Sequence, residues 1–265
     1  MMPSEEEIQK LLPFTAHRIQ IKNGIWTIPE GGDDPYSALS TRVVIERAGR
    51  SLAGKRILDL GCLEGGYSAA FSQMGAKEVV GIEVRKANIN RCLLVKQCLG
   101  LENLHFHQED VRNVSSDRFG KFNIVFAAGI LYHLDDPYTF LKNISEMTLD
   151  FALIDTHIAN KTSFGHGCSS VLVEKTFESQ KFIGREAREY PKGMKNAELE
   201  KHVWTSWGNP TSFWLTEESL VKMLGEVGFG YISKVYVPQG YRCGDNCKEE
   251  CRVIIVAKKD FGIKS

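Results

Sequence analysis

Short apolar runs alternate with segments of helical periodicity across the middle of the chain. The apolar runs are typical of buried strands, whereas the segments between them repeat apolar residues at the spacing of a helix face. The predicted strands are Ile57–Leu60, Glu78–Glu83, Leu104–Gln108, Phe122–Gly129 and Phe151–Asp155. The predicted helices between them are Tyr67–Met74, Lys86–Leu99 and Tyr138–Met147. This alternation indicates a mostly parallel sheet covered by helices on both faces.

Weaker patterns lie on either side of this region. Thr216 is placed to cap a helix that stops at Gly228. Strand-like runs follow that helix and are joined by a loop, which predicts an antiparallel hairpin. These outer elements are helices at 4–12, 36–48 and 216–227, an extended segment at 17–28, and hairpin strands at 231–237 and 252–257.

Residues 158–213 interrupt the alternation of strands and helices. The stretch is too long for a simple connection, so we expect an insertion or lid with structure of its own. Its mixed-charge part, Lys181–Lys201, is typical of a solvated surface. The predicted organisation is an N-terminal segment with cap helices at 1–49 and a main domain at 50–265 that carries the insertion.

The first strand opens into a glycine-rich loop, residues 61–66, before the chain turns helical. A strand that enters a helix through such a loop leaves unpaired backbone N–H groups and lets a ligand approach the main chain. Glu83 ends the second strand about 20 residues beyond Gly61, where a carboxylate can accept hydrogen bonds from both ribose hydroxyls. Together the two features predict a nucleotide-like cofactor.

Composition limits the expected partners and the cellular compartment of the protein. The formal net charge over 265 residues is zero, which does not favour nucleic acid or an anionic membrane as a partner. No apolar run approaches the roughly 20 residues that span a bilayer, and the acidic start is unlike a signal peptide. Seven scattered cysteines are typical of reduced thiols. We therefore expect a cytoplasmic protein, whose oligomeric state these features leave open.

Several motifs occur in a fixed order along the predicted sheet. They are Leu58-Asp59-Leu60-Gly61-x-x-x-Gly65, Gly81-Ile82-Glu83, Glu109-Asp110-Val111, Phe122-Asn123-Ile124-Val125 and, before the hairpin, Gly228-Phe229. Together they resemble the class I S-adenosylmethionine-dependent methyltransferases. The resemblance implies a doubly wound α/β fold, with a seven-stranded, mostly parallel sheet whose last strand is antiparallel. The lid would then be inserted between the fifth strand and the last helix.

The resemblance also implies S-adenosylmethionine as the cofactor and assigns residues to it. Gly61 and Gly65 would shape the loop beside the methionine part, and Asp59 would orient the loop and the cofactor ammonium. Glu83 would bind the ribose hydroxyls. The other residues assigned to the cofactor are Asp110 and Val111, which would hold and flank the adenine, and Ala128.

The chain departs from the family at Leu63, where a glycine is frequent, and at Asn123, where an aspartate is frequent. Leu63 also bears on the main alternative, a nicotinamide-dependent dehydrogenase. The glycine motif of such dehydrogenases, Gly-x-Gly-x-x-Gly, requires a second glycine that lets the backbone approach a pyrophosphate. Gly61-Cys62-Leu63 lacks this glycine. Since S-adenosylmethionine has no pyrophosphate, the methyltransferase interpretation is preferred.

Methyl transfer is an in-line displacement, so the protein has to align a nucleophile and, where needed, remove its proton. Candidate bases follow the fourth and fifth strands, at the sheet edge where open parallel sheets place their sites. They are His157, two residues after Asp155, and His133, for which packing or a backbone hydrogen bond at the helix start is the alternative. The predicted substrate contacts are Tyr132, Trp207 and Trp214, for which burial in the core is the alternative.

Two groups of residues are candidate metal ligands. Asp155, His157 and His166 fit no dense ligand motif. The cysteines of Cys243-x3-Cys247-x3-Cys251 match none of the common zinc spacings, although three close thiols leave a metal open. We predict no metal in the active site.

The preferred function is methyl transfer from S-adenosylmethionine to a small-molecule acceptor, such as a specialised metabolite, with a histidine as base. Whether the acceptor atom is oxygen, nitrogen or carbon stays open. One alternative is a transferase for wobble uridine in transfer RNA, because the segment 129–137 also resembles those enzymes. Another is a cofactor-binding module without catalysis.

Overall fold

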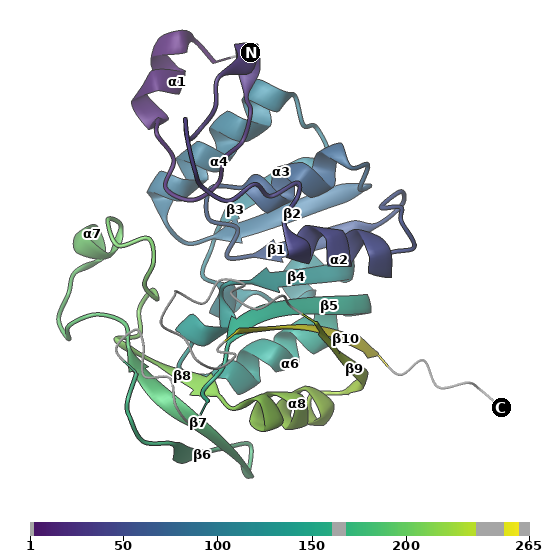
Figure 1. Ribbon diagram of the computed structural model, residues 1–265, viewed down its shortest axis with the longest axis vertical. Helices are drawn as coiled ribbons and strands as arrows, with labels where there is room; N and C mark the ends of the chain where they lie inside the picture. The colour runs from purple at the N-terminus through teal and green to yellow at the C-terminus, as the bar shows by residue number, and fades with distance from the viewer. Residues whose placement is uncertain (1–2, 161–167, 237–251, 260–265) are drawn as a thin grey trace. The chain divides into compact units, whose positions relative to one another are not determined.

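The computed structural model describes residues 3–160, 168–236 and 252–259. Seven strands form one sheet in the order β3-β2-β1-β4-β5-β10-β9 (Figure 1). The strands are β1 Arg56–Leu60, β2 Glu78–Glu83, β3 Leu104–Gln108, β4 Phe122–Ala128, β5 Thr148–His157, β9 Phe229–Val235 and β10 Arg252–Lys259. The predicted α/β class and the seven-stranded sheet are therefore confirmed.

Strand direction follows the expected pattern. β1 pairs in parallel with β2 and β4, and β2 pairs in parallel with β3. β10, the last strand in the chain, runs antiparallel to both β5 and β9. Apolar side chains of β1, β2 and β4 are almost fully buried, because strands in the interior of a parallel sheet are covered on both faces.

Helix boundaries reflect capping. Ser4 and Glu7 form a capping box at α1, and Thr216 caps α8 by accepting from Ser219 N at 3.2 Å. The helix predicted at 36–48 begins only at Leu39, because Tyr36 N donates to the Asp34 carboxylate and holds a turn there. The helices are α1 Glu5–Leu11, α2 Leu39–Arg47, α3 Gly66–Gln73, α4 Lys86–Leu99, α5 Ser116–Phe119, α6 Pro137–Met147, α7 Asn196–Leu199 and α8 Glu217–Glu226, with single 3-10 turns η1 Lys22–Gly24, η2 Val111–Asn113 and η3 Leu131–His133.

A second, antiparallel sheet lies in the predicted insertion, with β6 Val173–Phe177, β7 Gln180–Arg188 and β8 Thr211–Leu215 in the order β6-β7-β8. The prediction that Lys181–Lys201 is a solvated surface was wrong for β7. Phe182, Arg185 and Ala187 are buried there. Arg185 can be buried because its guanidinium donates to the carbonyl oxygens of Asn160 at 2.6 Å and Ser169 at 2.7 Å. Asn160 and Ser169 lie outside the mixed-charge run. The composition of that run therefore did not indicate that Arg185 is buried in a strand.

The chain divides into two compact units, one formed by residues 1–113 and 122–126 and the other by residues 114–121 and 127–265. Each is described by itself below. The sequence-based boundary between residues 49 and 50 remains a prediction. Among the helices of the described ranges, none combines the length and hydropathy that a bilayer-crossing segment requires.

Candidate active site

The glycine loop, residues 61–66, connects β1 to α3 in the first unit. Its backbone has positive φ at Gly61 (72°), Leu63 (52°) and Gly65 (78°). A side chain at Gly65 would also be blocked, because its Cβ would lie 2.8 Å from Phe106 Cζ. Leu63 adopts the left-handed conformation at a cost of roughly 1–2 kcal/mol. The loop therefore keeps, at Leu63, the backbone shape that a glycine would adopt without strain, although the chain departs from the family at this position.

Backbone N–H groups of the glycine loop are bonded within the protein. Gly61 N and Cys62 N both donate to Ile82 O at 2.9 Å. Gly66 N, at the start of α3, donates to His17 Nδ1 at 3.1 Å. The expectation of unpaired N–H groups at this helix start was therefore wrong for Gly66. A residue far earlier in the chain supplies the acceptor, and no local pattern around the loop signals it.

Glu83, predicted to bind ribose, is 4% exposed at the end of β2. Its carboxylate accepts from Leu63 N at 3.1 Å and Arg85 N at 2.7 Å, one bond on each oxygen. Burial raises the pKa of Glu83, and the bond from Arg85 N and the Arg85 charge partly oppose that rise. Since each carboxylate oxygen has two lone pairs, both can still accept from hydroxyl groups. The Glu83 carboxylate can therefore accept hydrogen bonds from the hydroxyl groups of a ribose.

Asp59 lies within β1 and is 1% exposed. Ser68 Oγ donates to its carboxylate at 2.6 Å. Burial raises the pKa of Asp59 to about 7, against the hydrogen bonds from Ser68, and the Glu83 charge adds to the rise. A buried carboxyl of this kind ionises more readily beside a cation, so it fits the predicted role toward an ammonium group. We call Asp59, the glycine loop and Glu83 the cradle.

The residues predicted to hold adenine follow β3. Val111 is 8% exposed and begins η2. Asp110 pairs with Arg112 through a contact of 2.6 Å between Oδ2 and Nη2 and a second bond from Arg112 Nε at 3.0 Å. The Asp110 carboxylate, which is predicted to hold the adenine amino group, thus already has Arg112 as a strong partner. Ala128 ends β4 and is half-buried; its role stays a prediction, as do those of Asp110 and Val111.

In the second unit, His133 and Glu189 form a partly buried dyad. His133 Nδ1 lies 2.9 Å from Glu189 Oε2, and the two side chains are 15% and 7% exposed. Ser212 Oγ donates to Glu189 Oε1 at 2.6 Å, and Ser206 N donates to Oε2 at 2.9 Å. Sequence reasoning missed Glu189, because it lies in the mixed-charge run and is brought to His133 only by the folding of the insertion.

His157, the other predicted base, lies among aromatic rings and a cation. Its ring stacks on Trp214 with centroids 5.0 Å apart and meets the edge of Tyr132 at 4.5 Å. Arg252 Nη1 is 3.4 Å from His157 Nε2, while Arg252 Nε donates to Asp155 Oδ1 at 2.5 Å. The guanidinium of Arg252 therefore contacts both Asp155 and His157, which the spacing of the two residues on β5 did not indicate.

The structure brings two of the three predicted substrate residues together. Tyr132 and Trp214 have ring centroids 5.7 Å apart, and Trp214 is 8% exposed. Burial raises the pKa of Tyr132, and the Arg252 charge partly opposes that rise. Trp207 is partly buried, whereas Trp204 is 60% exposed. Roles of Tyr132, Trp207 and Trp214 toward a substrate stay predictions.

A cavity of about 510 Å³ opens beside β7 and β8 in the second unit. Its wall mixes thiol, hydroxyl and charged groups, and its volume is typical of small-molecule sites. The neighbouring cluster of Ala159, Ala187 and Trp214 includes Cys168 and Tyr132 at its border. The cavity is lined by Cys168, Ser169, Glu186, Ala187, Arg188, Tyr190, Lys192, Pro210 and Thr211.

In the described part of the chain, no group of three or more His, Cys, Asp or Glu side chains is arranged to hold a metal ion. Four of the residues predicted as candidate metal ligands are not among the described residues. His166, Cys243, Cys247 and Cys251 lie outside the described residues. Whether those cysteines bind a metal therefore stays open.

Comparison with known proteins finds methyltransferases similar to part of this chain. Residues 51–180 match a methyltransferase domain. The ubiquinone biosynthesis O-methyltransferase of Acinetobacter baumannii strain AYE is 31% identical over 97 residues, which cover 37% of this chain and 40% of that protein. The tRNA U34 carboxymethyltransferase of Campylobacter hominis is 32% identical over 120 residues, covering 39% of this chain and 38% of its own. The chain thus spans about 40% of the length of the curated relatives that it matches.

Among solved structures, the N-terminal domain of EvdMO1, crystallised in the presence of SAH and D-fucose, has the same fold. Its TM-score is 0.72 at 23% identity, over 97% of this chain and 98% of that one. The domain match thus places a methyltransferase domain at residues 51–180, and the structural neighbour shows the fold. The match of residues 51–180 to a methyltransferase domain and the shared fold are consistent with the predicted class I S-adenosylmethionine-dependent methyltransferase family and, at the level of the class, with an enzyme that uses this cofactor.

We expect Glu83→Ala to weaken binding of S-adenosylhomocysteine by about 1–3 kcal/mol, because the variant removes hydrogen bonds from a charged acceptor. Isothermal titration calorimetry measures this loss. Glu83→Gln, which retains one acceptor oxygen, should lose less, and the exposed Glu102→Ala is the matched control. Equal affinities of Glu83→Ala and the wild type would remove Glu83 from the site.

Proposed function

We propose that this protein transfers a methyl group from S-adenosylmethionine to a hydroxyl group of a small polar molecule, with His133 as the base. The observation that carries the proposal is the contact of 2.9 Å between His133 Nδ1 and Glu189 Oε2. A carboxylate on one ring nitrogen orients the imidazole and leaves the other nitrogen to take a proton. This arrangement is typical of a general base.

The dyad would act as follows. Glu189 keeps the proton of His133 on Nδ1, so that Nε2 presents a lone pair. The acceptor hydroxyl gives its proton to Nε2 while its oxygen forms the new bond to the methyl carbon. When bound, S-adenosylmethionine supplies a methyl carbon on a sulfonium, whose bond to sulfur breaks as the electron pair returns to the sulfur. The cradle would hold the donor through Asp59 and Glu83.

His157 has a different environment, although it was the first candidate from the sequence. The Arg252 guanidinium lies 3.4 Å from its Nε2, and Trp214 stacks on its ring. A donor group at Nε2 competes for the lone pair that a base would use. These contacts favour a role in shaping an aromatic wall with Tyr132, and they support His133 as the base.

Two observations support a small hydroxylated acceptor. The cavity beside β7 and β8 has about the volume of a small-molecule site, and its wall carries the hydroxyl groups of Tyr190 and Thr211. The neighbour of similar fold was crystallised with SAH and D-fucose, a polyhydroxylated sugar, and one curated relative is an O-methyltransferase.

The test supplies the purified protein with methyl-labelled S-adenosylmethionine and three acceptor pools: free deoxy sugars, catechol-type phenols and bulk transfer RNA. We expect label in a methyl ether of a small molecule, identified by mass spectrometry. Label confined to RNA would support the second candidate, a transfer-RNA modifying enzyme, which the 32% identity to the tRNA U34 carboxymethyltransferase favours. Tight cofactor binding without turnover on any pool would favour a non-catalytic module.

A further inference from the structure

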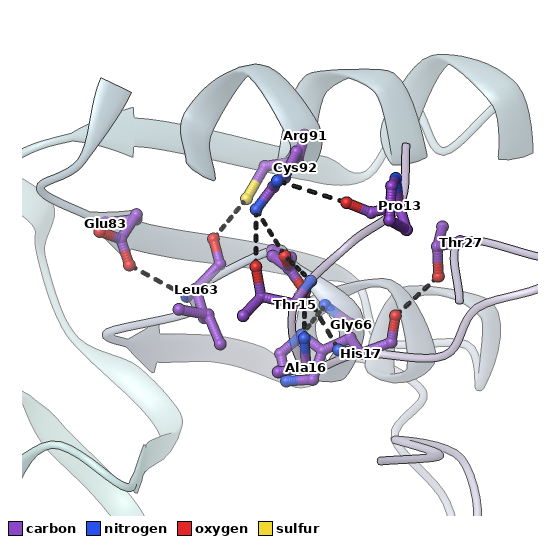
Figure 2. Close-up of polar contacts among 11 residues, drawn as sticks. Pro13, Thr15, Ala16, His17, Thr27, Leu63, Gly66, Glu83, Arg91 and Cys92 are labelled. Carbon is purple, nitrogen blue, oxygen red and sulfur yellow. Dashed lines mark hydrogen bonds and ion pairs between the residues drawn. The ribbon is translucent and has the colours of Figure 1, made fainter. Parts of the chain in front are cut away.

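The N-terminal residues 13–17, which we call the strap, are bound to the glycine loop by a single carboxylate. Figure 2 shows these contacts. Glu64 accepts from three successive backbone N–H groups of the strap: Thr15 at 2.5 Å, Ala16 at 3.0 Å and His17 at 3.1 Å. Three hydrogen bonds to one ionised acceptor form a strong attachment. Glu64 thus joins two segments that are distant in sequence.

The charge of Glu64 is balanced from α4. Arg91 Nη1 contacts Glu64 Oε1 at 2.8 Å, and the Glu64 side chain is fully buried. Arg91 also donates to Thr15 Oγ1 at 3.1 Å and to Pro13 O at 3.4 Å (Figure 2). The same ion pair therefore fixes the strap from a second side. Removing one partner of such a pair leaves a buried charge without compensation.

His17 makes the second link, directly to the start of α3. Its Nδ1 accepts from Gly66 N at 3.1 Å, which requires a neutral ring with its proton on Nε2. The ring is buried, and its edge meets Tyr67 with centroids 5.3 Å apart. A Cβ at Gly66 would lie 2.7 Å from His17 Cγ, so the glycine is what permits this approach.

The strap is itself held in place. Thr27 Oγ1 donates to His17 O at 2.6 Å and accepts from Ile19 N at 2.8 Å, while Phe14 N donates to Thr27 O at 2.8 Å. On the other side of Glu64, Leu63 N donates to Glu83, the predicted ribose ligand. A continuous set of hydrogen bonds therefore runs from Thr27 through the strap and Glu64 to the loop residues beside Glu83.

We infer that Glu64 and His17 are positioning residues for cofactor binding: by attaching the strap they hold the glycine loop in the shape that receives S-adenosylmethionine. The inference rests on the proposed function, because it concerns the same cofactor. Neither residue is required to touch the cofactor. Leu63, in its left-handed conformation, has an intrinsic preference for other loop shapes, and the attachments on either side of it oppose that preference.

The test measures binding of S-adenosylhomocysteine by calorimetry to the full chain, to three variants of the attachment and to one control variant. His17→Ala should bind about 5- to 10-fold more weakly at pH 8, the loss of one hydrogen bond. His17→Asn should stay within about 2-fold of the wild type there, because its amide oxygen can replace Nδ1 as acceptor. Glu64→Gln should lose more than about 10-fold, since it leaves Arg91 beside a neutral amide. Glu6→Gln, in an exposed ion pair on α1, is the control.

A pH profile separates positioning from general support of the fold. Protonated His17 cannot accept from Gly66 N, so wild-type affinity should fall with decreasing pH more steeply than that of His17→Asn. Asp59 and Glu83 titrate in both proteins, so the difference between the two profiles isolates His17. The charged and titratable groups around His17 are Glu64 from the glycine loop, Tyr67 from α3, Arg91 from α4 through Glu64, and Asp33, whose backbone forms a bridge with that of His17.

The outcomes distinguish this inference from the function on which it rests. A wild-type protein that does not bind S-adenosylhomocysteine overturns the proposed function. A wild-type protein that binds, together with a His17→Ala variant of equal affinity and equal melting temperature, overturns the inference alone. Parallel pH profiles for the wild type and His17→Asn overturn the role of His17 as well. If His17→Ala melts early, His17→Asn still decides, because it retains the acceptor.

Discussion

His133→Ala is expected to lower kcat by about 10²- to 10⁴-fold, the contribution typical of a general base, while leaving the affinity for S-adenosylhomocysteine unchanged. The cofactor affinity should stay because the residues that form the cradle belong to β1, the glycine loop and β2. Initial rates with the acceptor identified by labelling give kcat, and calorimetry gives the affinity. Loss of both together would point to a folding defect rather than to a missing base.

Two further variants sharpen this result. Glu189→Gln retains a hydrogen-bond partner for His133 Nδ1 but removes the charge that stabilises the protonated ring, so an intermediate loss of kcat is expected. His105→Ala, an exposed histidine on β3, controls for general effects of the substitution. If His157→Ala lowers kcat far more than His133→Ala, the base is His157 and the dyad has another role.

Arg252→Met is expected to reduce the free energy of unfolding by about 3–5 kcal/mol, because it leaves the carboxylate of Asp155 buried without its cation. The two side chains are 6% and 0% exposed, and they link β10 to β5 across paired strands. Urea unfolding followed by circular dichroism measures the change. A matched surface pair is Lys234 and Glu217, whose side chains are both 36% exposed, so Lys234→Met should cost less than about 1 kcal/mol.

A double variant tests the reason for the loss. Asp155→Leu combined with Arg252→Met removes both charges, so much of the stability should return. If the double variant is as unstable as Arg252→Met alone, the loss comes from packing of the arginine stem rather than from the uncompensated carboxylate. Equal stability of Arg252→Met and the wild type would show that the pair contributes little.

The sequence predicted those parts of the fold whose signal is local. The bounds of β2, α4 and β3 agree with the predicted ones, because an apolar run or a helical period contains the information within itself. Glu83 and the glycine loop could likewise be located from their spacing along one strand-loop-helix unit. The antiparallel hairpin of β9 and β10 followed from two strand-like runs near the end of the chain.

What the sequence could not provide are contacts between distant segments. Glu189 reaches His133 across 56 positions, and His17 reaches Gly66 across 49. No regular spacing in the sequence predicts either contact, because the partners meet only when the insertion or the N-terminal segment folds back. The expected association of Asp155 with His157 was also incomplete, since Arg252 from the last strand contacts both.

Of the two carboxyls with a raised pKa, Asp59 gives the cradle a property beyond its shape, because it can exchange a proton near neutrality. Asp59, with a pKa of about 7, is half protonated there, and burial raises the pKa of Glu83 as well. A cation bound beside them favours ionisation, so a positively charged cofactor would expel protons on arrival, and its binding is favoured above about pH 7. Methyl transfer removes the sulfonium charge. The product keeps its ammonium group, so Asp59 would take its proton back when the product leaves, and each turnover would include a proton cycle that is separate from the one at His133.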